Sequence, residues 1–309
     1  MHLTFGSSAA HDRTRQPVDP AKPAAMAARH GWKRFPYGDR IYRYVGSALQ
    51  TNWARLHRGD REPYPSAGAL ELLLEANPAL AVSVADPAMQ VPVLEDAWRA
   101  YHAGDFAAAL ELGLAAGPVG LVVAARAAVV YASHLEPDPN RRITILSDVV
   151  ASCSALVQLA PNWPAAWYAH GLALGRYSQN ISVLRALALG LGGKVRSSLN
   201  RVLELDPDHG DAHVALGVYH AEVIHKVGAA MAALAYGARR EALTAHFERA
   251  CGLLPQSPVV RAEYARAVLL VWGSPQLSRV HELFREAAAC QPCDALERLD
   301  VEWARSEIE

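Results

Sequence analysis

Apolar residues recur every three to four positions from about residue 68 to residue 309, and no stretch of this region sustains an alternation of apolar and polar residues. The first spacing places apolar side chains on one face of an α-helix, whereas alternation is typical of a half-buried strand. The pattern therefore predicts helices throughout residues 68–309. An apolar stretch at 112–132 is long enough to span a membrane, but glycines and Pro118 interrupt it. We therefore predict a turn between two buried helices there, and no membrane span.

Four proline-containing turns punctuate the helical region in a repeating context, at Pro161, Pro207, Pro255 and Pro292. A bulky residue stands eight positions before each of the last three prolines: Leu199, Phe247 and Phe284. A small residue stands ten positions after each of the first three: Gly171, Gly217 and Ala265. The bulky residue and the helix-stopping proline fit the end of one helix, and the small residue allows a second helix to approach closely. The spacing predicts a helix-turn-helix repeat.

These positions resemble the tetratricopeptide repeat (TPR) family. The stretch AWRAYHAGDFAAALELG extends the resemblance, since Gly104, Phe106 and Ala109 match the family's turn between helices and the start of its second helix. The resemblance covers roughly residues 90–292. It implies an all-α, TPR-like solenoid of stacked helical hairpins whose concave surface binds a partner.

Two repeats are longer than the family's unit of about 34 residues, because consecutive prolines are 46, 48 and 37 residues apart. The extra residues fall in 175–195 and 219–240, so we expect two elongated hairpins. If the insertions lengthen both arms, the tips project about 10 Å beyond an ordinary unit. Such hairpins also resemble the tetratricopeptide lipoproteins associated with TRAP transporters, which implies an exported, lipid-anchored protein beside a transporter.

The N-terminal part of the chain divides into two segments. Residues 1–30 are poor in bulky apolar residues and rich in proline, so we predict a disordered leader. Residues 31–67 combine aromatic and basic residues, a composition that fits either a nucleic-acid surface or a cap over the open end of the solenoid. We favour the cap, because the aromatic residues have no recurrent spacing. The remaining domain is the solenoid at 68–309, ending in a capping helix.

Composition narrows the class of partner and the cellular address. The 309 residues include 30 Lys and Arg against 31 Asp and Glu, a net charge of −1, which gives no overall attraction to nucleic acid. The start of the chain lacks the basic and apolar regions of a signal peptide, and four cysteines are too few for a disulfide framework. We expect a cytoplasmic protein, and a periplasmic address stays open.

Two groups of residues have the spacing of reactive or metal sites. His209 and His213 stand four apart, but a proline and a glycine place His209 in a turn, so we expect no metal site. Cys290 and Cys293 have the spacing of redox and zinc sites without the strand context or further ligands, so we expect a structural thiol pair. Whether the two cysteines form a disulfide stays open.

No catalytic or phosphate-binding motif is present in its required context, so we expect neither an enzyme nor a cofactor. An enzyme with a site between the N-terminal segment and the solenoid is the disfavoured third hypothesis. The first hypothesis is a non-enzymatic scaffold that holds a protein, an amphipathic helix or an apolar ligand on its concave surface. The second is an assembly protein that oligomerises or supports a complex through its hairpin tips.

In the repeat family, set positions of each first helix form the concave surface. The resemblance therefore implies a binding site at the matching positions, formed by Tyr168, Arg176, Asp211, Val218, Glu222 and Arg266. The same carry-over places Leu172, Val214, Ala262 and Leu269 along it, so an apolar or amphipathic guest suits it best. The family's carboxylate-binding Lys and Asn are absent from the corresponding positions. The segment at 296–309 could form an amphipathic helix, and whether that helix fills the groove stays open.

Overall fold

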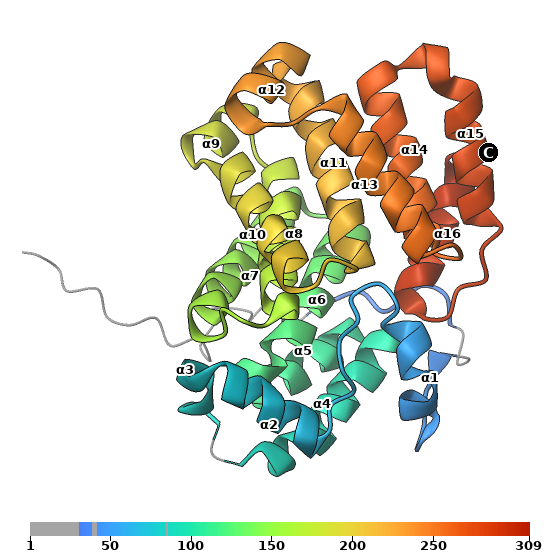
Figure 1. Ribbon diagram of the computed structural model, residues 1–309. Coiled ribbons are helices and arrows are strands. Elements are labelled where there is room, and N and C mark those ends of the chain that lie inside the picture. Colours follow the sequence, from blue (N-terminus) through green and yellow to red (C-terminus); the bar gives the residue numbers. More distant parts are fainter. Residues whose placement is uncertain (1–30, 39–41, 85) are drawn as a thin grey trace, which may run out of the picture.

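The structure is a computed structural model that describes residues 31–38, 42–84 and 86–309. The leader predicted at 1–30 lies outside the described residues. Every regular element in the described part of the chain is a helix, and no strand occurs there (Figure 1). The all-α prediction is confirmed.

The helices follow one another as short antiparallel neighbours. The larger ones, in chain order, are α1 (Ala48–Leu56), α2 (Ala67–Ala76), α4 (Pro87–His102), α5 (Phe106–Ala115), α6 (Leu121–Val130), α7 (Pro139–Leu159), α8 (Pro164–Gln179), α10 (Leu191–Leu205), α11 (Gly210–Val227), α13 (Arg240–Leu253), α14 (Pro258–Trp272), α15 (Leu277–Ala288) and α16 (Ala295–Ser306). The short ones are α3 (Pro78–Ala81), α9 (Val183–Ala188), α12 (Ala229–Tyr236) and the single turns Gly117–Gly120, Tyr131–Leu135 and Ser274–Gln276. The two helices pack directly against each other in each of the pairs α4/α5, α7/α8, α8/α10, α11/α13 and α14/α15.

Local sequence fixes where many of these helices begin. The side chains of Ser66, Asp105 and Asp294 accept hydrogen bonds from backbone N–H groups in the first turns of α2, α5 and α16. These caps satisfy N–H groups that have no partner within the helix. Proline occupies the first turn of α4, α7, α8 and α14, where its missing N–H costs nothing.

The predicted repeat contacts are present. A Cβ atom placed on Gly171 would lie 2.9 Å from Leu199, and one placed on Gly217 would lie 2.6 Å from Phe247. Only glycine therefore fits at these two crossings. Ala265 packs in the same cluster as Phe284. The spacing of bulky and small residues in the sequence thus identified helices that cross closely in the structure.

The apolar stretch at 112–132 forms a turn between core helices, as predicted. The turn Gly117–Gly120 separates α5 from α6, and α6 packs between α5 and α7. Gly117–Leu135 and Pro139–Leu159 are long and apolar enough to cross a membrane, but 78% of the first one's most apolar window is buried in the fold, against 39% for the second. Core helices meet the same criteria, so the described residues contain no clear membrane span.

The two long hairpins differ from straight extensions of their arms. The chain leaves α8 at Gln179 and forms the separate short helix α9 before α10 begins. Likewise, Gly228 has a φ of 80° and separates α11 from α12. The insertions therefore form two extra short helices, which lie at the same end of the molecule (Figure 1).

The C-terminal helix brings the two ends of the solenoid together. α16 packs on α14 and α15 and also reaches α4. The Tyr44 hydroxyl donates a hydrogen bond to the Cys293 carbonyl, 249 residues further along the chain. In Figure 1, α16 lies above α1 on the right of the view. The superhelix thus curls until the N-terminal helices meet the C-terminal one.

Candidate binding cavity

The curled solenoid surrounds a central cavity of about 240 Å³. Residues of α6, α8, α11, α14 and α16 line it, together with the loop after α1 and parts of α9 and α10. Because α8, α11 and α14 are the first helices of successive hairpins, the cavity occupies the concave side of the repeat. The groove expected from the sequence is therefore present, and α16 closes one side of it.

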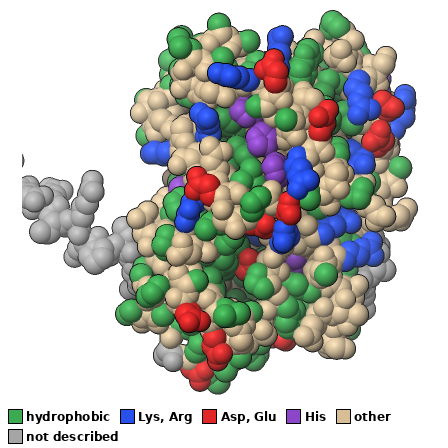
Figure 2. All heavy atoms as spheres, in the orientation of Figure 1, with side chains coloured by type: hydrophobic (Ala, Val, Ile, Leu, Met, Phe, Trp, Pro, Cys, Tyr) green, Lys and Arg blue, Asp and Glu red, His purple; other side chains and the backbone are tan. Residues whose placement is uncertain are grey.

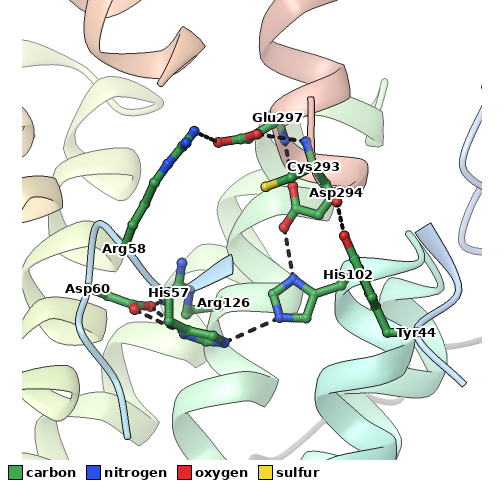
Figure 3. Close-up of polar contacts among 9 residues, drawn as sticks. All are labelled: Tyr44, His57, Arg58, Asp60, His102, Arg126, Cys293, Asp294 and Glu297. Atoms are coloured by element: carbon green, nitrogen blue, oxygen red, sulfur yellow. Dashed lines mark hydrogen bonds and ion pairs between the residues drawn. The ribbon is translucent and has the colours of Figure 1, made fainter. Parts of the chain in front are cut away.

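A chain of buried polar contacts joins the N-terminal loop to the C-terminal turn (Figure 3). His57 Nδ1 lies 2.9 Å from Asp60 Oδ1, and His57 Nε2 lies 3.3 Å from His102 Nε2. His102 Nδ1 in turn lies 2.9 Å from Asp294 Oδ2. The guanidinium of Arg126 pairs with the other oxygen of Asp60. Both imidazoles are buried, so the network lies inside the seam where the chain ends meet.

The two histidines are linked to each other and to one carboxylate each. In each of the three contacts the ring nitrogen that donates is set by the tautomer of the imidazole. Burial lowers the pKa of His57 well below its ordinary value, with the charges of His102 and Arg126 acting in the same direction. His57 is therefore neutral at neutral pH.

A second bridge closes the same seam nearer the surface. Arg58 pairs with Glu297 at the start of α16, and Glu297 Oε2 accepts a hydrogen bond of 2.8 Å from the Cys293 backbone N–H. Asp211 N, in the first turn of α11, donates to Gly59 O at 3.0 Å. The loop that follows α1 is thus tied to both α11 and α16.

Ion pairs fasten the wall formed by α8, α11 and α14. Arg176 of α8 lies 2.9 Å from Glu263 of α14, and Arg266 contacts both Glu263 and Glu222 of α11. Lys226 adds a contact of 3.3 Å to Glu222. Burial alone raises the pKa of Glu263, but the two arginines lower it below its ordinary value. Glu263 is therefore ionised and fully paired.

Two carboxylates of the cavity stay without a partner. The basic residues in its lining are Arg58, Arg126, Arg176 and Lys226, and each already pairs with a carboxylate. No described residue donates a hydrogen bond or forms an ion pair with the side chain of Asp211 or of Asp300, which is 3% exposed. Burial raises the pKa of both, for Asp300 well above its ordinary value and with help from Glu263.

Two tyrosines, Tyr101 and Tyr168, also line the cavity. The Tyr101 hydroxyl is buried and has no hydrogen-bond partner among the described residues. The Tyr168 ring also lines the cavity, and the Arg126 guanidinium lies 5.5 Å from the centre of the Tyr101 ring and 5.9 Å from that of Tyr168. The aromatic faces here already accommodate one cation.

The rest of the lining is largely apolar. Its side chains come from α8, α11 and the two hairpin tips, and they include Leu172, Leu187, Leu191, Val195, Val214, Val218, Tyr219, Val223, Val227 and Tyr236. The cavity therefore has a polar end beside α16 and an apolar end beneath the hairpin tips. A guest that fills it must match both.

The structure places five of the six residues expected to form the site in the cavity lining: Tyr168, Arg176, Asp211, Val218 and Glu222. Arg266 lies beside them and contacts Glu222. On α14, Val259 and Glu263 line the cavity, whereas Ala262 is buried in a cluster with residues of α15. Leu269 is 41% exposed and does not line it.

Several residues of the cavity were missed from the sequence. Arg126 is the single charged residue of the apolar stretch at 112–132, and that isolation was the available signal. Asp294 and Asp300 belong to the C-terminal helix, whose docking position depends on long-range contacts. His57 and Asp60 follow α1 in a loop that carries no motif. The contacts of these residues form only where the two ends of the solenoid meet.

The histidine and cysteine groups singled out from the sequence serve local structure. His209 accepts a hydrogen bond from Ala212 N at the start of α11, and His213 Nδ1 lies 2.9 Å from His246 Nδ1. Figure 2 shows histidines in a row over α11 and α13. In the described ranges, no group of three or more His, Cys, Asp or Glu residues has the geometry of a metal site. Cys290 and Cys293 are free thiols.

Comparison with known proteins supports the fold. The chain is similar to the crystal structure of a thermophilic TPR protein from Thermus thermophilus, with a TM-score of 0.51 and 17% sequence identity. The match covers 70% of this chain and 99% of that one. No family model and no curated protein matches the sequence. The chain therefore has a TPR-like fold.

Proposed function

We propose that this protein is a non-enzymatic binding protein that holds a partly apolar, positively charged segment of a protein or peptide partner in its central cavity. The TPR-like fold supports a partner-binding role. The observation that carries the finer proposal is the presence of two unpaired carboxylates, Asp211 and Asp300, in a cavity whose remaining wall is largely apolar.

The unpaired carboxylates of the cavity favour a positively charged guest. An unpaired buried carboxylate costs several kcal/mol if ionised, and its pKa rises in consequence. An ammonium or guanidinium group placed beside either Asp211 or Asp300 would remove this cost for that carboxylate, and the same cavity presents the rings of Tyr101 and Tyr168. An anionic guest would meet the same carboxylates unfavourably. The cavity thus favours a cation with an apolar body.

The polar network at the seam supports a binding role over a catalytic one. His57, His102, Asp60 and Asp294 have the residue types of acid–base catalysis, and they lie between the N-terminal segment and the solenoid, where the disfavoured enzyme hypothesis put its site. Each of them is bonded within the network, and both imidazoles are buried. These contacts leave no free nitrogen directed at a guest, so the network serves chain closure.

The experiment compares three probes that share one apolar chain: n-octylamine, n-octanol and n-octanoate, measured by isothermal titration calorimetry. We expect octylamine to bind most tightly and octanoate most weakly. Asp300→Asn should weaken octylamine about tenfold or more, since hydrogen bonds to charged groups contribute about 1.5–3 kcal/mol. Asp211→Asn should act in the same direction. Asp86→Asn, at an exposed helix cap outside the cavity lining, is the matched control.

Proton release gives an independent readout. Because burial raises the pKa of Asp300 in the free protein, a bound ammonium should lower that pKa and release a proton. The affinity for octylamine should therefore increase as the pH rises, and Asp300→Asn should remove much of that increase. Octanoate binding as tightly as octylamine, or an Asp300→Asn variant with wild-type affinity at every pH, would contradict the proposal.

A further inference from the structure

The two hairpin tips carry six exposed large apolar side chains. We define the tip surface as residues 181–196, which contain α9, and residues 225–240, which contain α12. Its exposed large side chains are Val183 (39%), Leu184 (80%), Leu187 (42%), Leu189 (42%), Met231 (52%) and Leu234 (86%). Arg196 Nη1 donates to Tyr236 O at 3.1 Å, which ties the two parts together.

The charge of the tip surface has one sign. Its two stretches contain six basic residues, Arg185, Lys194, Arg196, Lys226, Arg239 and Arg240, and neither contains an Asp or a Glu. Five of the six are exposed, and within the described residues only Lys226 pairs with a carboxylate, that of Glu222. Figure 2 shows hydrophobic and basic side chains over α12 and the start of α10. The surface is therefore apolar and cationic together, although the whole chain has a net charge of −1.

We propose that the tip surface docks on the surface of an anionic lipid bilayer. Exposed leucines beside Arg and Lys are the composition of interfacial helices, whose apolar side chains enter the acyl boundary while their basic side chains meet lipid phosphates. α9 and α12 have six and eight residues, too few to span a bilayer. The tips therefore lie in the interface and do not cross it.

Charge also argues against a second copy of the chain as the occupant. A symmetric dimer would bring the same basic patch of each protomer against the other, and like charges in an interface oppose association. Other exposed apolar side chains have different neighbours. Leu72 on α2 is 68% exposed, but Glu71 and Glu75 flank it on the same helix. At the tips, by contrast, the exposed apolar side chains lie among basic residues and no acidic one.

The test is co-sedimentation of the full chain with vesicles of phosphatidylcholine alone and of phosphatidylcholine containing about 30 mol% phosphatidylserine. We expect binding to the anionic vesicles and little to the neutral ones. The pair Leu184→Asp and Leu234→Asp should abolish binding, because carboxylates would enter the interface. Leu72→Asp, a leucine of similar exposure outside the tip surface, should bind like the wild type.

The charge contribution is measured separately with Arg185→Gln and Lys194→Gln. Each should weaken vesicle binding about fivefold at low salt, with Arg34→Gln as the exposed basic control. Equal binding to both kinds of vesicle, or unchanged binding by the tip variants, would overturn the proposal. So would a lipid-free dimer, detected by sedimentation velocity, that the paired leucine variant dissociates. Octylamine binding by that variant should stay at the wild-type level, which separates this test from that of the cavity.

Discussion

His102 shows how single residues hold the ends of this chain together. Its Nδ1 contacts Asp294, 192 residues further on, and its Nε2 contacts His57, 45 residues earlier. A buried carboxylate left without its partner costs far more than an exposed one, because the interior does not solvate it. The seam therefore depends on all members of the network.

At this scale we predict that Asp294→Asn lowers the free energy of unfolding by about 2 kcal/mol at neutral pH. Burial alone raises the pKa of Asp294, but the hydrogen bond and charge of His102 lower it below its ordinary value. A carboxyl with a lower pKa in the folded state stabilises the fold above about pH 4 and loses that contribution as the pH falls through the folded-state pKa.

The difference between wild type and Asp294→Asn, measured by urea unfolding across the pH range, should therefore shrink below about pH 4. Asp105→Asn, at an exposed helix cap, should give a small difference that does not change with pH in this way. A constant difference for Asp294→Asn down to about pH 3 would show that its ionisation does not contribute to the seam.

Helix packing at the level of elements depends on a few close crossings. α11 and α13 meet where Gly217 faces Phe247, and α8 and α10 meet where Gly171 faces Leu199. A side chain at either glycine would need to displace a buried bulky residue. Interiors packed to crystal density resist such a shift.

We predict that Gly217→Leu lowers the free energy of unfolding by about 1–3 kcal/mol through overpacking against Phe247. Gly252→Ala, within α13, is the control, because no atom lies within 4 Å of the added Cβ. Alanine there should be neutral or stabilising by about 0.5–1 kcal/mol. Chemical denaturation measures both. An unchanged stability for Gly217→Leu would contradict the helix pairing.

Closure of the solenoid is the property of the whole molecule that creates the cavity. The loop after α1 supplies Arg58 and His57, and the C-terminal turn supplies Asp294 and Glu297. Trp32 also stacks on Tyr131 at a centroid distance of 3.9 Å. The aromatic N-terminal segment thus lies against the solenoid, where we proposed a cap.

We predict that deletion of residues 1–64 leaves His102, Trp98 and Arg126 without their buried partners, so that the melting temperature falls and the protein aggregates. Deletion of residues 1–30 is the control, since every contact named here lies beyond residue 30. Light scattering during thermal melting distinguishes the two. If the longer deletion stays monomeric and stable but loses binding to a nucleic acid, the segment is a nucleic-acid surface and not a cap.

The sequence by itself determined the helical class, the proline turns, the helix crossings and most of the concave residues. These features depend on contacts within a hairpin or between neighbours, and a repeat of fixed length encodes such contacts as spacing. The repeat spacing alone therefore predicted that residues such as Tyr168 and Val218 face the cavity. The expectation was less accurate on α14, where Glu263 and not Ala262 lines the cavity and Leu269 lies outside it.

Only the tertiary structure decided that the solenoid closes on itself, and with it the seam of His57, His102 and Asp294. Closure depends on the cumulative rotation from one hairpin to the next, to which every helix crossing contributes and which no local spacing records. The unpaired state of Asp300 follows from the same cause, since its helix reaches the cavity only in the closed ring. The partners of a charge are a property of the assembled fold, because residues distant in the chain supply them.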